Sequence, residues 1–476
     1  MITASRMAAV DRNAAALGVP RKQLMESSGN AIAREVHDLA GTDDVVAVVA
    51  GRGNNGGDAF VAARFLDDLE VTVHLLGRPE SIRTDIARDN WAALREAEYD
   101  ARVVRDSRTL DLGDPDVVVD ALLGTGIAGA PREPEASAIE AINGVGGTVL
   151  SVDVPSGVDA DTGEAAGVAV DADRVVTFHD EKPGLAALDT GVAVADIGIP
   201  EAAERFVGPG DLLAIGRDPE SHKGDHGRIL VIGGGPYAGA PALSGQAALR
   251  AGADLAYVAV PDAVAETVQG YAENLIVERY EGERLTPTWV DPLLDRASER
   301  DVVVLGPGLG DAPETLDAVR DFLESYDGRA VVDADALAVV PEVSTDATLV
   351  CTPHGGELAG MGGPGENDPG DHAEAIEAFA ADLGHILLLK GSDDVISDGE
   401  TTQVNRTGNA GMTVGGTGDV LAGITGALLA TLEPRKAAAV AAYANGRAGD
   451  LVVEDRNNGL LATDLLDRVP EAMQDE

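Results

Sequence analysis

The chain has 476 residues, 45% of them hydrophobic, which is enough for two domains that each bury a full core. It carries 35 Lys and Arg against 82 Asp and Glu, a formal charge of −47 that argues against nucleic-acid binding, because phosphate backbones are bound by basic surfaces. The single cysteine, Cys351, excludes a disulfide within the chain.

The acidic composition also bears on the solution in which the protein works. At low salt the charges would repel one another, because the Debye length is still about 8 Å at physiological ionic strength, whereas multimolar salt would screen them. This charge, with only 3% aromatic residues, is typical of a halophile with a salty cytoplasm, and an acidic interaction surface is the alternative. No apolar run approaches the length of a membrane span, and residues 1–12 lack an apolar signal segment. We therefore expect a soluble cytoplasmic enzyme.

Short apolar strands alternate with helical patterns through the first half of the chain. Such alternation predicts a mostly parallel sheet with helices on both faces. The predicted strands are 45–50, 71–76, 117–120, 149–152 and 175–178.

A glycine-rich turn, residues 53–58 (Gly-Asn-Asn-Gly-Gly-Asp), follows the first of these strands and opens a predicted helix. The backbone N–H groups at a helix start can bind anionic oxygen, so the turn suits phosphate. The glycine spacing of a dinucleotide-binding turn is present, but the next strand runs into His74-Leu75-Leu76-Gly77 instead of an acidic residue. Conventional NAD binding is therefore not expected.

Two further strand ends, residues 120–126 and 151–157, combine glycine, carboxylate and hydroxyl groups. Because parallel strands bring their carboxyl ends to one edge of a sheet, we expect these loops to converge. The alternative is that Asp120 and Asp153 only cap turns.

With Leu24-Met25-Glu26 and residues 182–185 (Lys-Pro-Gly-Leu), these stretches resemble the NAD(P)H-hydrate epimerase family over almost the whole first half. The resemblance implies that Asp153 handles protons during epimerisation. It also implies a potassium site at Asn55, Asp120 and Ser156, and mixed oxygen ligands of this kind suit a large cation. The implied substrate-binding residues are Asn54, Asn55, Gly56, Gly57, Asp58, Gly124, Thr125, Gly126, Ile127, Ala128, Gly129, Ala130 and Asp153.

A polar, turn-forming break at residues 217–221 follows the apolar residues 212–215, and we place a domain boundary there. The predicted domains are 1–216 and 217–476. The strand and helix alternation then restarts, with predicted strands at 229–232, 256–260, 302–305, 331–333, 349–352 and 386–390.

The most informative stretch is residues 415–419 (Gly-Gly-Thr-Gly-Asp), which opens a helix rich in Ala, Gly and Leu. The free N–H groups of Gly416, Thr417 and Gly418 can hold anionic oxygen, and Asp419 lies beside them as a base. The alternative for Asp419 is an acid that only stabilises the helix dipole. Four predicted strand ends should meet at the same sheet edge, namely 233–235, 306–310, 352–354 and 390–394.

With residues 222–227, 239–241 and 352–357, these motifs resemble the ribokinase-like superfamily and, within it, the ADP/ATP-dependent NAD(P)H-hydrate dehydratases. The resemblance implies phosphoryl transfer from ADP to the C6 hydroxyl of a hydrated cofactor, with Asp419 as the base. The implied substrate-binding residues are Ala240, Gly308, His354 and Asp419. The implied nucleotide-binding residues are Lys390, Gly391, Ser392, Asp393, Asp394, Gly416, Thr417 and Gly418.

Four positions are left open by the sequence. Asp394 departs from the threonine common in related sequences. His354 could instead cap a helix or lie buried, and Asp333 and Asp335 are unassigned strand-end acids. Magnesium is expected as counter-charge for ADP, although no compact cluster of metal ligands is visible.

The two halves together resemble the bifunctional NAD(P)H-hydrate repair enzymes. The fold expected is α/β: a Rossmann-like three-layer epimerase domain followed by a ribokinase-like doubly wound dehydratase domain. Hydrated NAD(P)H, written NAD(P)HX, and ADP are the expected partners, with potassium as the epimerase cofactor, and we expect a homo-oligomer. A small-molecule kinase with a non-catalytic N-terminal assembly domain is the alternative function.

Overall fold

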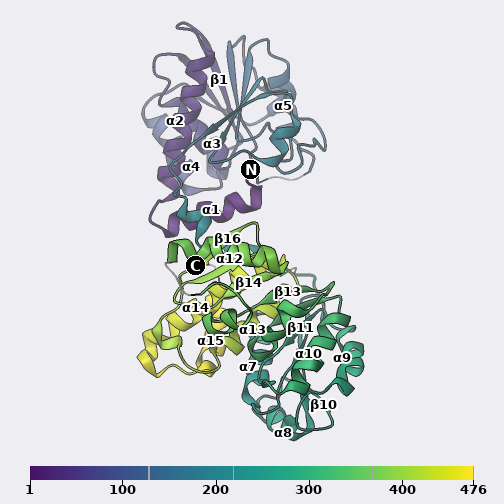
Figure 1. The fold of residues 1–476 in the computed structure, drawn as a ribbon. Coiled ribbons are helices and arrows are strands. Elements are labelled where there is room, and N and C mark those ends of the chain that lie inside the picture. Colours follow the sequence, from purple (N-terminus) through teal and green to yellow (C-terminus); the bar gives the residue numbers. More distant parts are fainter. Residues whose placement is uncertain (127–128, 218, 366–368, 475–476) are drawn as a thin grey trace. The chain divides into compact units, whose positions relative to one another are not determined.

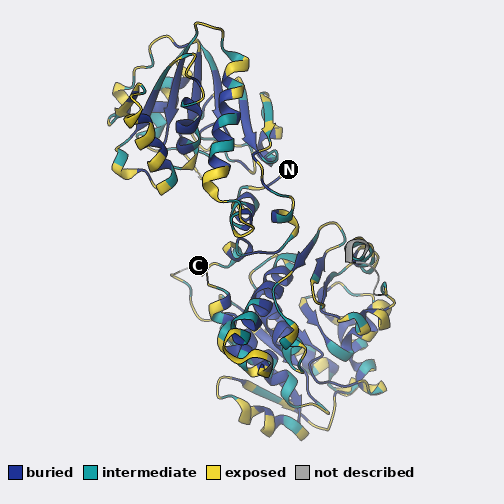
Figure 2. Cartoon of the chain, turned by 90° about the vertical axis from the view of Figure 1, so that its left-hand side faces the viewer, coloured by how far each residue is buried: buried dark blue, intermediate teal, exposed yellow. Residues whose placement is uncertain are grey.

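The computed structural model describes residues 1–126, 129–217, 219–365 and 369–474. The chain divides into two compact units, Met1–Ala203 and Glu204–Glu476 (Figure 1). Figure 2 shows that the strands of both units are buried and that most exposed residues lie on helices and loops. Among the described residues, no helix is both long and apolar enough to cross a bilayer.

The first unit contains a seven-stranded sheet in the order β3-β2-β1-β4-β5-β6-β7, and every neighbouring pair is parallel. Successive residues of a strand face opposite cores: Val48 packs in one buried cluster and Val49 in another. This is the pattern of a sheet covered on both faces, as predicted. The strands are β1 Val45–Ala50, β2 Glu70–Leu76, β3 Ala101–Val104, β4 Val117–Ala121, β5 Thr148–Val152, β6 Arg174–Phe178 and β7 Gly191–Ala195.

Helices connect these strands. Helix α2 is amphipathic and buries Leu24, Ile32 and Val36 against the sheet. The helices of this part of the chain are α1 Ala4–Ala16, α2 Arg21–Leu39, α3 Asn54–Ala63, α4 Asp85–Glu96, α5 Glu135–Asn143 and α6 Ala202–Arg205, and the 3₁₀ helices are η1 Pro79–Ser81, η2 Ser107–Thr109 and η3 Pro183–Ala187.

The second unit contains a nine-stranded sheet in the order β10-β9-β8-β11-β12-β13-β14-β15-β16. Strands β8 to β14 pair in parallel, whereas β15 and β16 add an antiparallel edge. The strands are β8 Arg228–Ile232, β9 Leu255–Pro261, β10 Ile276–Tyr280, β11 Val302–Leu305, β12 Arg329–Val332, β13 Thr348–Cys351, β14 Ile386–Leu389, β15 Asp394–Ser397 and β16 Thr402–Asn405.

Helices cover both faces of this sheet, so the doubly wound prediction is confirmed. The helices are α7 Gly239–Arg250, α8 Asp262–Tyr271, α9 Val290–Ala297, α10 Pro313–Ser325, α11 Gly355–Gly360, α12 Pro369–Leu383, α13 Thr417–Leu429, α14 Pro434–Arg456 and α15 Ala462–Ala472. The 3₁₀ helices are η4 Asp211–Ala214, η5 Pro287–Trp289, η6 Ala334–Glu342, η7 Ala410–Met412 and η8 Asn457–Gly459.

The apolar segment before the predicted boundary packs on the second core. Val207 donates its N–H to the carbonyl of Val404 at 3.0 Å, and Val207 and Leu212 are buried in the cluster formed by α7, α13 and α14. The second compact unit therefore begins at Glu204, because the segment that follows packs on the core of that unit.

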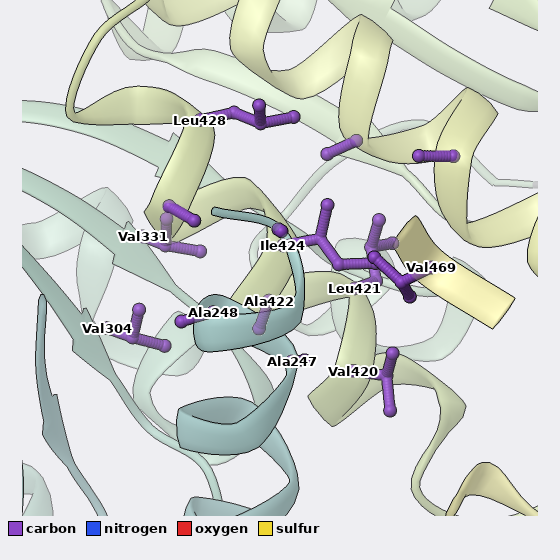
Figure 3. Close-up of a cluster of buried hydrophobic side chains, with 14 of the residues drawn as sticks. Ala247, Ala248, Val304, Val331, Val420, Leu421, Ala422, Ile424, Leu428 and Val469 are labelled. Atoms are coloured by element: carbon purple, nitrogen blue, oxygen red, sulfur yellow. The ribbon is translucent and has the colours of Figure 1, made fainter. Parts of the chain in front are cut away.

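Helix α13 lies in the core of the second unit, against α7 and the sheet (Figure 3). Two glycines allow this close approach: a Cβ on Gly423 would lie 2.1 Å from the carbonyl oxygen of Ser244, and one on Gly426 would lie 2.6 Å from Val304. At the far end of the helix, the guanidinium of Arg329 donates to the carbonyls of Leu429 at 2.8 Å and Leu432 at 3.3 Å. The position of the helix start is thus set by packing along its whole length.

Candidate active sites

A cavity of about 590 Å³ lies at the carboxyl edge of the second sheet, beside the start of α13. It brings together four of the predicted ligand-binding residues, Ala240, Gly308, Gly416 and Asp419. Its other lining residues are Pro236, Tyr237, Ala238, Gly239, Leu243, Ala334, Asp335 and Gly415.

The helix start is shaped by Gly416, whose φ of 101° lies in the left-handed region. A Cβ at this position would approach Leu243 to 2.8 Å and Ala462 to 2.9 Å, so glycine is required both for the backbone angle and for the space. No side chain caps the N-terminus of α13, and the hydroxyl of Thr417 instead donates to the carbonyl of Met412 at 3.0 Å. The first N–H groups of the helix therefore remain available for an anionic ligand.

Asp419 lies in the first turn of α13 and lines the cavity. The pKa of its carboxyl is raised to about 7, mainly by burial and then by Asp333, while Lys390 opposes the rise and Glu357 adds a smaller contribution to it. A carboxylate that binds a proton near neutral pH is suited to general base catalysis. The role of Asp419 as the base remains a prediction.

Lys390 follows β14 and lies next to the same helix start. Its ammonium is 2.8 Å from Asp333 Oδ1 and 3.6 Å from Glu357 Oε2, and a Cβ on Gly418 would lie 3.4 Å from it. Burial disfavours the charged ammonium, but the two carboxylates outweigh burial and raise the pKa of Lys390 overall. A permanent cation therefore stands beside the N–H groups that would bind phosphate.

The loop after Lys390 is folded by Asp394. One carboxylate oxygen accepts the N–H of Gly391 at 3.0 Å, and the other accepts the side-chain amide of Asn405 at 2.9 Å. Burial raises the pKa of Asp394 to about 6. The departure from threonine at this position thus has a structural role, while Gly391, Ser392 and Asp393 are exposed.

His354 caps helix α11. Its Nδ1 accepts the N–H of Gly356 at 2.9 Å and that of Glu357 at 3.2 Å, while Glu357 Oε2 accepts the N–H of His354 at 2.7 Å. This capping box is the alternative that the sequence left open. His354 does not line the cavity of Asp419, although it bridges to Lys390 in the sheet. A substrate contact for His354 remains a prediction.

In the first unit, the predicted potassium ligands converge on Leu123. The amide of Asn55 donates to the carbonyls of Leu123 at 3.0 Å and Val152 at 3.3 Å. The hydroxyl of Ser156 accepts the N–H of Leu123 at 2.9 Å. The same hydroxyl donates to Asp120 Oδ1 at 2.6 Å, so the three side chains share one network.

Asp120 is fully buried at the end of β4. Its carboxylate also accepts the hydroxyl of Ser151 at 2.8 Å and the N–H groups of Ser156 at 2.9 Å and Leu122 at 3.3 Å. Burial raises the pKa of Asp120, and these hydrogen bonds oppose the rise. Among the described residues there is no group of three or more His, Cys, Asp or Glu that could hold a metal ion.

Asp153 directly follows β5 with a φ of 68°, a left-handed conformation that is uncommon for aspartate. Its Oδ1 accepts the hydroxyl of Thr177 at 3.1 Å and lies 3.1 Å from the ammonium of Lys182. Lys182 is only 1% exposed and also donates to the carbonyls of Phe178 and Asp180. Strained backbone and a buried cation together fix this carboxylate.

Two further acids interact with Asp153. Burial raises the pKa of Asp58 well above its usual value, with Asp153 and then Asp11 adding to the effect. Burial likewise raises the pKa of Asp11, on α1, to about 6, although Arg21 opposes this rise. Acids from α1, α3 and the end of β5 thus lie close enough to influence one another electrostatically.

Part of the predicted substrate loop lines a cavity in the first unit, and Asp11, Asp58 and Asp153 are not among the described residues that line it. Gly124 and Gly129 line this cavity of about 250 Å³ with Leu123, Val154 and Gly157. Asn54 accepts the hydroxyl of Thr84 at 2.8 Å, and a Cβ on Gly56 would lie 2.2 Å from the carbonyl of Gly51. Thr125, Gly126 and Ala130 flank the cavity loop, Gly57 is packed against Met25, and the predicted Ile127 and Ala128 lie outside the described residues.

Sequence reasoning did not assign Lys182, Asp333, Tyr237 or Asp11. Lysine is scarce, with five in the chain; Lys182 is buried beside Asp153, and Lys390 is half-buried beside Asp333. The scarcity of lysine could have pointed to Lys182. The position of a carboxylate directly after a buried strand could have pointed to Asp333. Tyr237 and Asp11 belong to no motif.

The fold and the site of the second unit define an α/β enzyme of the ribokinase-like class. The unit is similar to the ADP/ATP-dependent NAD(P)H-hydrate dehydratase from Bacillus subtilis co-crystallised with ATP/Mg²⁺, with a TM-score of 0.50 and 27% identity over 56% of this chain and 97% of that one. The family model for NAD(P)H-hydrate dehydratase matches residues 229–471, and the model for the YjeF-related protein N-terminus matches residues 21–184.

Full-length relatives match both halves at once. The bifunctional NAD(P)H-hydrate repair enzyme of Methanothermobacter thermautotrophicus is 44% identical over 98% of this chain and 94% of its own length, and that of Archaeoglobus fulgidus is 42% identical over 99% and 98%. The chain belongs to the family of bifunctional NAD(P)H-hydrate repair enzymes.

Proposed function

We propose that the two sites repair hydrated nicotinamide cofactors in two steps, epimerisation in the first unit and ADP-dependent dehydration in the second. As a member of its family, the chain is a bifunctional NAD(P)H-hydrate epimerase and dehydratase. The observation that carries the dehydration step is Asp419: a half-buried carboxylate in the first turn of α13, with no hydrogen bond or ion pair to its side chain from the described residues, in a cavity that continues to Gly308 and Ala240.

In the proposed dehydration, Asp419 accepts the proton of the C6 hydroxyl of (S)-NAD(P)HX. The hydroxyl oxygen attacks the terminal phosphorus of ADP, the bond to the bridging oxygen breaks, and AMP leaves. Phosphate is a far better leaving group than hydroxide, so the lone pair of the ring nitrogen then expels it from C6. Loss of a proton from C5 completes NAD(P)H, and the balance is one AMP and one phosphate for each ADP.

The phosphoryl group would be bound where α13 begins. We propose that the N–H groups of residues 416–418, at a helix start that no side chain caps, bind this group and that Lys390 neutralises charge on it. We propose residues 390–394 as the remainder of the nucleotide site, with Mg²⁺ bound through the phosphates of ADP and not by a dedicated set of protein ligands.

For epimerisation, we propose that Asp153 exchanges the proton and that potassium supports the substrate loop. Asn55 carries an amide oxygen, the carbonyls of Leu123 and Val152, which accept the amide N–H groups of Asn55 at 3.0 and 3.3 Å, are further oxygens of the kind that potassium binds, and Asp120 carries negative charge. A large monovalent ion bound by carbonyl and amide oxygens would hold the loop from 123 onward. Exchange of potassium for lithium should slow epimerisation and leave dehydration unchanged, and an equal effect on both would contradict the assignment.

The assay of the full-length protein distinguishes this function from a small-molecule kinase. Incubation with mixed R and S hydrates and ADP should restore the absorbance of reduced nicotinamide for both epimers, with equal amounts of AMP and phosphate. A stable phosphorylated product would favour the kinase, and recovery of only half the hydrate would favour a non-catalytic first domain.

Further proposals concern the setting of the enzyme. The charge of −47 supports work in a concentrated salt cytoplasm, and activity that is lost in dilute buffer and restored by potassium chloride would support it. We propose a homo-oligomer, which sedimentation in high salt would test. We propose that epimerisation requires residues 1–216 and dehydration residues 217–476, although residues 204–216 pack with the second unit.

A further inference from the structure

The carboxylate of Asp419 has no cationic partner, although a lysine is close to it. Lys390 acts on Asp419 electrostatically, yet its ammonium contacts Asp333 and Glu357 instead. In the described part of the chain, no hydrogen bond or ion pair reaches the side chain of Asp419; only its backbone carbonyl is bonded, by the hydroxyl of Ser244. Something therefore holds Lys390 away from Asp419.

Asp333 is placed to do so. It directly follows β12 and is 2% exposed. Its Oδ1 accepts the hydroxyl of Thr352 at 2.7 Å and contacts Lys390 Nζ at 2.8 Å. Because β12, β13 and β14 are parallel neighbours, residues 333, 352 and 390 follow their strands at the same sheet edge. The carboxylate is thus fixed by the sheet before any ligand binds.

We propose that Asp333 is a positioning residue that retains the ammonium of Lys390 and so leaves Asp419 free to take the proton of the substrate hydroxyl. The inference rests on the proposed dehydratase function. An ion pair with lysine commonly lowers the pKa of a carboxyl by about 1–3 units and makes it a weaker base. A buried pair between Lys390 and Asp419 would therefore oppose catalysis.

Without Asp333, the ammonium of Lys390 would be left with the other titratable groups around it. Glu357 on α11 and Asp419 on α13 are then the carboxylates left for Lys390. Asp335 on η6 and Tyr237 line the cavity on its other side, and burial followed by Asp311 raises the pKa of Asp335. Of these groups, Asp419 both lines the cavity and interacts electrostatically with Asp333 and Lys390.

The experiment compares Asp333→Asn, which keeps the shape and the bond to Thr352, with Asp333→Ala, which also removes the acceptor. Asp321→Asn, an exposed acid of α10, is the matched control. The first readout is the pH dependence of dehydration at saturating ADP and hydrate. The second is a crystal structure of each variant at mildly alkaline pH, and epimerase activity with thermal unfolding reports folding.

Both Asp333 variants should lose about tenfold in kcat, with the acidic limb of the profile shifted to lower pH, and Lys390 should lie within salt-bridge distance of Asp419. In a Lys390→Met background, Asp333→Asn should change kcat by no more than about twofold. An unpaired Asp419 in the variant crystals, or an equal loss in the Lys390→Met background, would overturn the inference. A wild-type protein without dehydratase activity would refute the proposed function instead, and the crystal structures would still decide the role of Asp333.

Discussion

Replacement of Asp419 by asparagine tests the central step of the proposed reaction. The variant keeps the shape of the side chain and removes its ability to accept a proton. Loss of a general base costs about 10²–10⁴-fold in rate, so kcat for dehydration should fall by that factor while epimerisation continues unchanged. The exposed acid Asp321 again provides the matched control, as Asp321→Asn.

The same residue predicts two pH effects with opposite signs. Because the pKa of Asp419 is raised to about 7, the active carboxylate is present above that pH and is lost as the pH falls, so wild-type kcat should drop about tenfold for each unit below it. In the unfolded chain the carboxyl ionises near 3.8, so the folded state gives up stability as the pH rises between the two values. The cost is at most about 4 kcal/mol, and Asp419→Asn should raise Tm at alkaline pH.

The assay follows the recovery of reduced nicotinamide from purified S hydrate, with a second measurement that starts from the R hydrate. Urea unfolding at acidic and alkaline pH measures the stability difference. A variant that dehydrates at the wild-type rate would refute the assignment of Asp419 as the base. A variant that is inactive and also less stable at alkaline pH would show that the carboxylate serves the fold.

Three further predictions concern single positions. Asp153→Asn should abolish exchange of R and S hydrates and spare dehydration of the S form; loss of both activities would contradict two separate sites. Tyr237 lines the cavity and is 63% exposed, so a flat ring could stack on it. Tyr237→Ala should therefore raise the KM for hydrate about tenfold, whereas Tyr237→Phe should not. A KM for Tyr237→Ala equal to that of the wild type would show that Tyr237 does not contact the hydrate. Gly416→Ala should cost about 2 kcal/mol or more, because alanine is strained at a φ of 101° and would meet Leu243, and an unchanged Tm would show that the helix start can rearrange.

Burial explains which strands could be predicted from the sequence. The strands at the centre of each sheet are covered on both faces and therefore form apolar runs that a reader can recognise. The missed strands are β3, β7 and β10, which lie at sheet edges and contain exposed residues, and β15 and β16, which form the antiparallel hairpin and are mostly buried but contain polar residues. The order of the strands comes from contacts between distant segments, which no local pattern contains.

The candidate sites divide in the same way. Asp419 and its glycines are adjacent in sequence, so the turn and its chemistry could be recognised together, and the cavity brings Gly308 and Ala240 to them. Lys182 and Asp333 contact residues that follow other strands, so only the folded sheet brings each of them to its partner. His354 was ambiguous, because a histidine after a strand can bind a ligand or cap a helix, and its hydrogen bonds are decided by the turn that follows.

Residues at the two ends of strand β12 lie near the two ends of helix α13. Arg329 at its beginning donates to the carbonyl of Leu429, the last residue of α13, and to that of Leu432 beyond it, while Asp333 just after the strand contacts Lys390 near the opposite end. The C-terminal end of α13 is therefore capped by a cation from this strand, whereas no side chain caps its N-terminal end, where we propose that the nucleotide binds. Substitution of Arg329 should therefore loosen the end of α13 opposite Asp419 and so disturb the position of the helix start.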